Sequence, residues 1–277
     1  EVAGKVGHRW WLWVVITRDT CVYLLDPSRS ADVPRNHLGE DAEGIINADR
    51  YSAYKVLEKE GHFRIAFCWF HVRQDFFRIH EEYAKLRAWA DGWLKRINDL
   101  FERNDRRLQF PQGSEQFGLE DQELRKALER VLETCKSELA DPDLHRAAKK
   151  ALVSLQNHWD GLLLFVDHPE IPMDNNESER RLRNPVVGRK NYYGSGSIWS
   201  GTLSAILFTL FQTLLLNHID PQKHLVAYFE ACARNGGKPP EDLEAFLPWN
   251  LSEERKADWQ YPLKRKNAGS PQKNQPP

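Results

Sequence analysis

The sequence predicts an α/β protein whose core is interrupted by a long helical insertion. In the first 75 residues, short runs of aromatic and β-branched residues, typical of strands, are separated by segments that predict helices. From about residue 76 to 165, apolar residues recur at spacings of three and four, as on one face of a helix. A very apolar helix near residues 203–216 then closes the core. Strands with helices between them, followed by a helical block, indicate this architecture.

Each predicted element has a local reason. Residues 10–17 and 20–25 are strand-like runs separated by Arg18 and Asp19, which predicts a β-hairpin. The elements expected after the hairpin are a short helix at 33–38, a buried strand at 44–49, a helix at 51–60, a strand at 63–69, a helical block with one clear break at 110–114, and a helix from 220 to about 236.

These elements divide the chain into five predicted parts. The parts are a first core segment at 1–75, a helical insertion at 76–165, the end of the core at 166–217, a helical extension at 218–250 and a disordered tail at 251–277. The tail is assigned to disorder because it is polar and rich in Gln, Pro and Asn.

Composition excludes several classes of protein. The 277 residues are 41% hydrophobic, enough for a full core, and 39 Lys and Arg against 40 Asp and Glu give a net charge of −1. Any nucleic-acid surface must therefore be local. Four scattered cysteines without a CxxC pair argue against a zinc knuckle or a disulfide framework and favour the cytoplasm. No apolar run approaches the length of a membrane span, which predicts a soluble protein without membrane partners.

Asp49 is the first candidate for chemistry. It ends the predicted strand at 44–49, and open α/β sheets place ligands at the carboxyl ends of their strands. Asp is also a preferred helix N-cap, and a helix is expected to begin at Tyr51. On spacing alone, capping is the stronger interpretation.

The second candidate is the polar cluster at residues 174–183, which opens a predicted helix. Capping accounts for Asp174, Asn175 and one glutamate of the first turns. It does not account for the basic residues that follow, because cations near a helix N-terminus oppose the helix dipole. A bound phosphate and a solvated basic face explain them equally well. These residues are Arg180, Arg181, Arg183, Arg189 and Lys190.

His71 and Arg73 beside Cys68 form a weaker pattern. One Cys and one His three residues apart could be half of a metal site, but the sequence has no second pair. A structural or DNA-contacting role is the better interpretation of His71 and Arg73.

Taken in order, four motifs resemble the insertion-sequence-66 family of DDE transposases. They are ADRYSAY at 48–54, CWFHVR at 68–73, DNNESERRLR at 174–183 with GRKN at 188–191, and LPWN at 247–250. The resemblance covers about residues 1–250, and it is specific because the motifs occur together and in order.

The resemblance implies a ribonuclease-H-like fold in which two aspartates and one glutamate hold two Mg²⁺ or Mn²⁺ ions. Such ions, about 3.5 to 4 Å apart, activate an attacking oxygen and stabilise the leaving oxygen of a phosphodiester. By position, Asp49 matches the second aspartate and Glu179 the glutamate. Both are therefore expected to be catalytic metal ligands, with carboxylates no more than about 10 Å apart.

The first aspartate of the family has no counterpart here. It lies on a strand before the segment that resembles residues 5–13, and neither Asp19 nor Asp26 replaces it convincingly. The sequence is therefore interpreted as a truncated catalytic region that is inactive by itself.

The implied function is metal-dependent cleavage and transfer of an insertion sequence in the bacterial cytoplasm. The implied partners are transposon-end and target DNA and further copies of the protein in a transposition complex. Two alternatives stay open: a catalytically dead DNA-binding or assembly remnant, and a ribonuclease-H-like nuclease that cuts without joining. The expected DNA contacts are His71, Arg73, Arg180, Arg183, Arg189 and Lys190.

Overall fold

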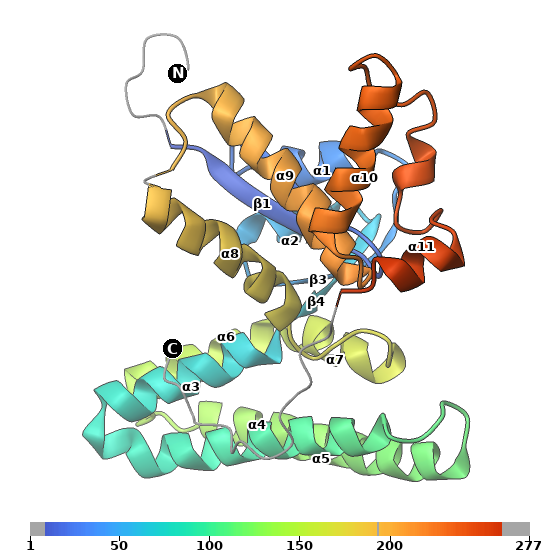
Figure 1. Cartoon of the computed structure of the whole chain (residues 1–277). Helices are drawn as coiled ribbons and strands as arrows, with labels where there is room; N and C mark the ends of the chain where they lie inside the picture. Colours follow the sequence, from blue (N-terminus) through green and yellow to red (C-terminus); the bar gives the residue numbers. More distant parts are fainter. Residues whose placement is uncertain (1–8, 193, 262–277) are drawn as a thin grey trace. The chain divides into compact units, whose positions relative to one another are not determined.

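The computed structural model describes residues 9–192 and 194–261, which fall into two compact units (Figure 1). The hairpin unit consists of Glu1–Ser28 and Glu177–Pro277, and the helical unit consists of Arg29–Asn176. Most described residues lie in helices, and the strands form small sheets, so the chain is α/β as predicted.

The hairpin unit is built on the predicted β-hairpin. Strands β1 (Trp11–Ile16) and β2 (Cys21–Asp26) pair antiparallel, with Val14 opposite Tyr23. The Thr17 amide donates to the Thr20 carbonyl at 2.9 Å and closes the turn. This confirms the prediction made from the two strand-like runs.

Helix α9 (Ile198–Leu216) packs on the hairpin, which confirms the expectation that the apolar helix lies against a sheet. The Thr213 hydroxyl accepts from the Cys21 amide at 3.1 Å and lies 3.2 Å from the Cys21 carbonyl, to which it donates. Thr209 accepts from the Tyr23 amide at 2.9 Å. A Cβ at Gly201 would lie 2.6 Å from Leu25 Cδ2, so a larger residue there would require the Leu25 side chain to move.

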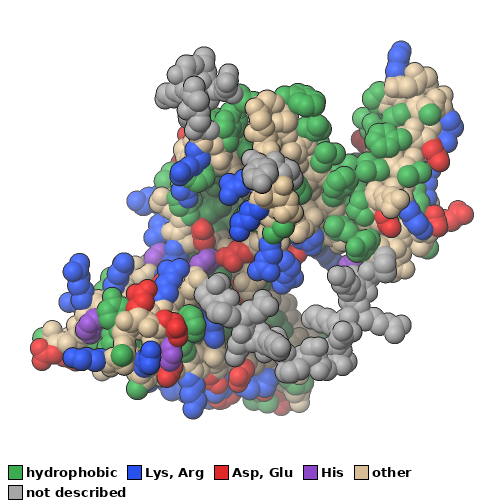
Figure 2. All heavy atoms as spheres, turned by 60° about the vertical axis from the view of Figure 1, so that its left-hand side comes forward, with side chains coloured by type: hydrophobic (Ala, Val, Ile, Leu, Met, Phe, Trp, Pro, Cys, Tyr) green, Lys and Arg blue, Asp and Glu red, His purple; other side chains and the backbone are tan. Residues whose placement is uncertain are grey.

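The prediction that no apolar run approaches the length of a membrane span is wrong for α9. With 19 residues, no charged side chain and a mean hydropathy of 1.5, it is long and apolar enough to cross a membrane by length and composition. Length and composition alone do not distinguish a membrane-spanning helix from one that packs on a sheet, as α9 does on β2. Much of α9 nevertheless faces outward: Trp199 is 74% exposed and Ile206 58% exposed. Figure 2 shows such hydrophobic side chains in green on the surface.

The C-terminal segment of the hairpin unit is folded further than predicted. After α10 (Pro221–Arg234) and the 3₁₀ turn Glu244–Phe246 comes a short helix, α11 (Glu253–Asp258). Leu251 and Trp259 are buried against Leu214 and Ile219. Residues 251–261 are therefore ordered, contrary to the predicted disordered tail, because two large apolar side chains anchor them. The rest of that tail, residues 262–277, lies outside the described residues.

The sheet of the helical unit contains two parallel strands. After α1 (Asp32–Leu38), β3 (Gly44–Ala48) and β4 (Phe63–Phe67) pair in parallel, and α2 (Ser52–Lys59) connects them. The strand predicted at 63–69 ends earlier than expected. Trp69 already begins the next helix, where its indole donates to the Leu162 carbonyl at 2.8 Å and is fully buried.

The helical block follows β4, and α4 and α5 lie side by side in Figure 1. The predicted break at 110–114 is confirmed between α4 and α5, but further breaks lie between α3 and α4, α5 and α6, and α6 and α7. The expectation of one clear break is therefore wrong. The helices are α3 (Trp69–Glu82), the 3₁₀ turn Ala84–Leu86, α4 (Arg87–Arg107), α5 (Glu115–Leu139), α6 (Arg146–Asn157) and α7 (Trp159–Asp167).

Helix α7 packs directly on the backbone of β4. A Cβ at Gly161 would lie 2.4 Å from the Ile65 carbonyl oxygen and 2.5 Å from the Phe67 ring. No side chain other than that of glycine fits without moving the helix. Gly161 therefore sets how closely the helical block approaches the sheet.

A buried arginine joins three helices of this block. Arg107 at the end of α4 is fully buried and donates to Asp121 of α5 at 2.6 Å. It also donates to the Val166 and Phe165 carbonyls at the end of α7, at 2.9 and 3.0 Å. These carbonyls have no intrahelical donor, so the guanidinium caps α7. Although burial opposes ionisation, hydrogen bonds from Arg125 and Arg107 hold the pKa of Asp121 below its usual value.

Replacing Arg107 by Ala should destabilise the helical unit by about 3 to 5 kcal/mol, because it leaves buried carbonyls without donors and breaks a buried ion pair. The neighbouring Arg106 has a side chain that is 46% exposed, so Arg106→Ala should change stability by less than about 0.5 kcal/mol. Urea unfolding of both variants measures the difference. Equal effects would contradict the role given to Arg107.

Candidate functional site

Asp49 lies directly after β3 and organises the turn into α2. Its Oδ1 accepts from the Tyr51 amide at 2.9 Å, so the capping interpretation is confirmed in part. The N-cap position itself belongs to Tyr51. Burial and the negative charge of Asp49 raise the pKa of Tyr54 to about 12, so this phenol stays neutral beside the carboxylate.

Arg50, the next residue, also holds this turn. Its guanidinium lies 2.7 Å from Asp75 of α3, donates to the Ser154 hydroxyl of α6 at 2.7 Å, and donates to the His71 carbonyl at 3.1 Å. Only 19% of the Arg50 side chain is exposed. Arg50 therefore ties the turn after Asp49 to two helices, a role that the sequence did not reveal.

Asn47 joins the two motif segments of the helical unit. This β3 residue, two positions before Asp49, donates through Nδ2 to the Pro172 carbonyl at 2.7 Å and to the Asp174 carbonyl at 3.1 Å. One amide therefore holds the loop that leads into the helix carrying Glu179. A polar side chain inside the apolar run GIINA was the signal in the sequence that could have identified it.

The same loop is held at the end of β4. The Trp69 amide donates to the Met173 carbonyl at 2.8 Å, and the Asn175 amide donates to Cys68 Sγ at 3.4 Å. Burial raises the pKa of the Cys68 thiol, which makes it a neutral hydrogen-bond acceptor. Residues 172–175 therefore run along the carboxyl ends of both parallel strands.

Helix α8 (Asn176–Tyr192) begins with a compact polar turn. Asp174 accepts from the Asn176 backbone amide at 3.1 Å and from its side-chain amide at 2.6 Å. In the hairpin unit, Glu177 lies 2.9 Å from Arg180 and 2.7 Å from Arg181. Capping thus explains Asp174, and two arginines compensate the charge of Glu177.

The basic residues of α8 divide into two groups. Arg181 is largely buried and donates to Gln212 of α9 at 2.9 Å, so it has a structural role. The residues predicted to contact DNA are exposed, and the Arg180 side chain is exposed to 70% although it pairs with Glu177. They are Arg180, Arg183, Arg189 and Lys190.

His71 and Arg73 lie on α3 of the helical unit. The His71 carbonyl accepts from Arg50, and Arg73 Nε donates to Asn98 of α4 at 2.9 Å. Both residues therefore take part in packing the helical unit. Their contact with DNA stays a prediction.

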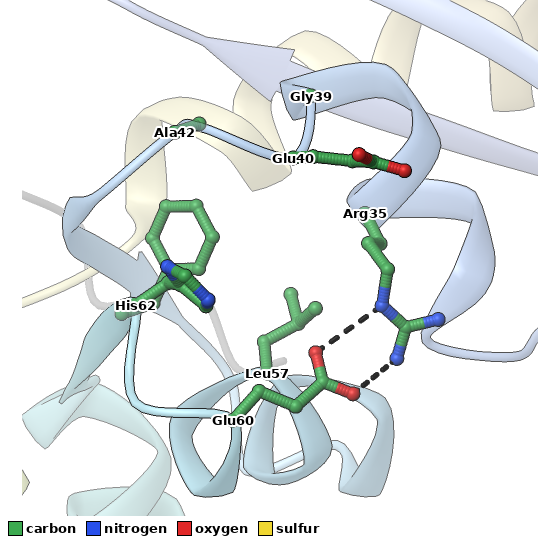
Figure 3. A pocket seen from close by; sticks show the side chains of 8 residues that line it. Arg35, Gly39, Glu40, Ala42, Leu57, Glu60 and His62 are labelled. Carbon is green, nitrogen blue, oxygen red and sulfur yellow. Dashed lines mark hydrogen bonds and ion pairs between the residues drawn. The ribbon is translucent and has the colours of Figure 1, made fainter.

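A small cavity of about 240 Å³ in the helical unit lies away from these motifs (Figure 3). Arg35 and Glu60 line it and form an ion pair, with 3.2 Å between Arg35 Nε and Glu60 Oε2. The positive charge of Arg35 and the negative charge of Glu60 neutralise each other. None of the predicted site residues lines the cavity. It is not the candidate site.

Comparison with known proteins identifies the family. The sequence profile described as Transposase IS66 family matches residues 2–203. The chain belongs to the IS66 transposase family. The matched segment contains the motifs around Asp49, His71 and Glu179, so the resemblance stated from these motifs is confirmed.

The chain is also similar to proteins of Sinorhizobium fredii (strain NBRC 101917 / NGR234). Uncharacterized protein y4jD is 28% identical over 238 residues, which is 82% of this chain and 45% of that protein. Uncharacterized protein y4qI is 26% identical over 265 residues, 90% of this chain and 48% of that protein. The chain thus spans about half the length of these relatives. No solved structure matches it.

Two buried amide oxygens in the motif segments are of a type that hard divalent cations accept as ligands. Asn47 Oδ1 and Asn175 Oδ1 are buried without a hydrogen-bond partner among the described residues, and amide oxygens are ligands that Mg²⁺ accepts. In the part of the chain that the structure describes, no three His, Cys, Asp or Glu side chains form a metal-binding group. Asp49 belongs to the helical unit and Glu179 to the hairpin unit, so a metal site shared by them stays a prediction.

Replacing Asn47 by Leu should destabilise the helical unit by about 1 to 2 kcal/mol, because the Pro172 and Asp174 carbonyls lose their donor. Faster hydrogen exchange of the Asn175 and Asn176 amides is also expected. Urea unfolding and amide exchange measure both effects. The exposed Asn157 of the helical unit, changed to Leu in the same way, serves as the control, and unchanged exchange in the Asn47 variant would contradict the bridge.

Proposed function

We propose that this chain is the catalytic region of a transposase that cuts and joins DNA with divalent metal ions. The proposal includes a ribonuclease-H-like core interrupted by the helical insertion at 76–165. Asp49 and Glu179 serve as metal ligands. The observation that carries the proposal is the hydrogen bonding of Asn47 to the Pro172 and Asp174 carbonyls.

The Asn47 contacts support a common site through chain connectivity. Asn47 precedes Asp49 by two residues, and the loop that it holds leads into α8 at Asn176. Three further residues lead to Glu179, and three residues span at most about 11 Å even when fully extended. The chain connection from this loop to Glu179 is therefore short, which supports the proposal that Glu179 and Asp49 serve one site.

The family motif selects Glu179 rather than its neighbour Glu177, which lies 2.9 Å from Arg180 and 2.7 Å from Arg181. Glu179 is the carboxylate that matches the glutamate of the family motif.

The proposed chemistry is an in-line attack on a phosphodiester. When bound, the divalent ions supply the charge that activates the attacking oxygen and stabilises the leaving one. A water or DNA 3′-hydroxyl oxygen forms the new bond to phosphorus, and the 3′-oxygen of the cut strand leaves with its electron pair. Asp49 and Glu179 contribute the negative charge that holds the ions. The exposed cations of α8 hold neighbouring phosphates of transposon-end or target DNA.

Glu179→Gln in the complete gene product should lower metal-dependent cleavage at least about a hundredfold, because it removes a metal ligand whose ion contributes several kcal/mol to the transition state. Glu177→Gln is the matched control, two residues away on the same helix, and should keep most of the activity. Cleavage and joining are measured with labelled transposon ends over a range of Mg²⁺ concentrations.

The outcomes of this experiment separate the competing functions. Equal activities of the two variants would overturn the assignment of Glu179. Cleavage without joining in the unchanged protein would instead identify a nuclease. DNA binding without either reaction would identify a remnant that only binds or assembles.

Alanine changes on α8 should flatten the salt dependence of DNA binding. Each lost phosphate contact lowers the slope of log K against log salt by about 0.9 for duplex DNA. Arg183, Arg189 and Lys190 should each show this change. The effect of Arg180 should be smaller, since Glu177 competes for its guanidinium. Lys126→Ala on α5 of the helical unit is the control, and unchanged slopes in all α8 variants would favour a solvated basic face.

A further inference from the structure

Helix α8 has a proline in its interior. Pro185 lies nine positions after the start of the helix and is buried. Because proline has no N–H, the carbonyl four residues earlier, that of Arg181, loses its intrahelical donor. Buried backbone carbonyls are almost always paired, so a different donor is needed at this position.

Tyr23 of β2 supplies that donor. Its hydroxyl donates to the Arg181 carbonyl at 2.9 Å. The Tyr23 side chain has little freedom, because the residue is only 3% exposed and its ring lies 5.8 Å from that of Phe208. Burial, with a smaller contribution from Cys21, raises the pKa of Tyr23, so the phenol remains a proton donor.

A second contact holds the same turn of α8. The Arg181 side chain bonds to Gln212 of α9, and Leu182 packs against the cluster of Cys21, Tyr23 and Ala205. The backbone and the side chain of Arg181 are thus both attached to the β-hairpin and its covering helix. All these contacts lie within the hairpin unit.

We propose that Tyr23 is a positioning residue for Glu179. Its hydroxyl replaces the N–H that Pro185 lacks and fixes the height and rotation of the α8 turn two residues after Glu179. This inference rests on the proposed function, in which Glu179 is a metal ligand. It adds that the rigid β-hairpin, through one phenol, sets where that carboxylate points.

The pairing of Tyr23 with Pro185 gives a direct test. Tyr23→Phe alone should raise the unfolding equilibrium constant of the chain about tenfold, since it leaves the Arg181 carbonyl without a donor. In a Pro185→Ala background, the new Ala N–H can bond the Arg181 carbonyl within the helix. Tyr23→Phe should then change the unfolding constant less than about threefold, and urea unfolding of all four proteins measures this coupling.

Mn²⁺ binding tests the positioning role. Mn²⁺ is titrated into the chain and followed by electron paramagnetic resonance. Tyr23→Phe should weaken the Glu179-dependent part of binding several-fold, and Pro185→Ala combined with Tyr23→Phe should restore it. Rescue by a second change is not expected if Tyr23 only contributes general stability. Tyr83→Phe, at an exposed tyrosine of the helical unit, is the control.

Two results would overturn the inference. Equal effects of Tyr23→Phe with and without Pro185 would show that the phenol does not replace the missing N–H. Unchanged Mn²⁺ affinity in the Tyr23→Phe protein would show a purely structural residue. If Glu179→Gln leaves Mn²⁺ binding unchanged, the proposed function fails and the positioning role fails with it, whereas the unfolding coupling would still report the hydrogen bond.

Discussion

The buried charge of Arg107 is the constraint on which the helical unit depends. A guanidinium without solvent must keep its partners, and these belong to three different helices. The hydrogen bonds from Arg107 to the carbonyls at the end of α7 have the widest effect, because α7 also packs on the sheet. Gly161 brings α7 against β4, and the Leu162 carbonyl receives the indole of Trp69. Helix α7 therefore connects the helical block to the ends of the strands.

Residues 172–175 link the strand ends to α8, because their backbone groups bond to residues at the ends of β3 and β4. The loop could leave the sheet in many directions, but Asn47, Cys68 and Trp69 each bind one or more of its backbone groups. Strand ends that carry Asp49 and a loop that leads to Glu179 are thereby built into the same unit. The family assignment says which carboxylates to consider, and this hydrogen bonding holds the loop that leads into α8 at the ends of the two strands.

Local patterns in the sequence predicted what local physics decides. The strand-like runs predicted the β-hairpin, and the three-and-four spacing predicted the helices, because burial of one face dominates each element. Contacts between distant residues were not predictable in this way. Trp69 starts a helix because carbonyls about a hundred residues further along the chain receive its N–H groups, and residues 251–261 fold because Trp259 is buried against α9. The candidate metal ligands came from ordered motifs, and no spacing rule alone would have chosen Glu179 over Glu177.

Thr209 and Thr213 of α9 determine which edge of the β-hairpin has backbone groups open to a further strand. Thr209 and Thr213 occupy the outward-facing backbone groups of Tyr23 and Cys21, so β2 offers no free edge there. On β1, the outward groups of Leu12, Val14 and Ile16 have no partner among the described residues, as the register of the hairpin requires. The two edges of the hairpin therefore differ: α9 satisfies the outward backbone groups of β2 at Cys21 and Tyr23, whereas those of β1 point away from the hairpin.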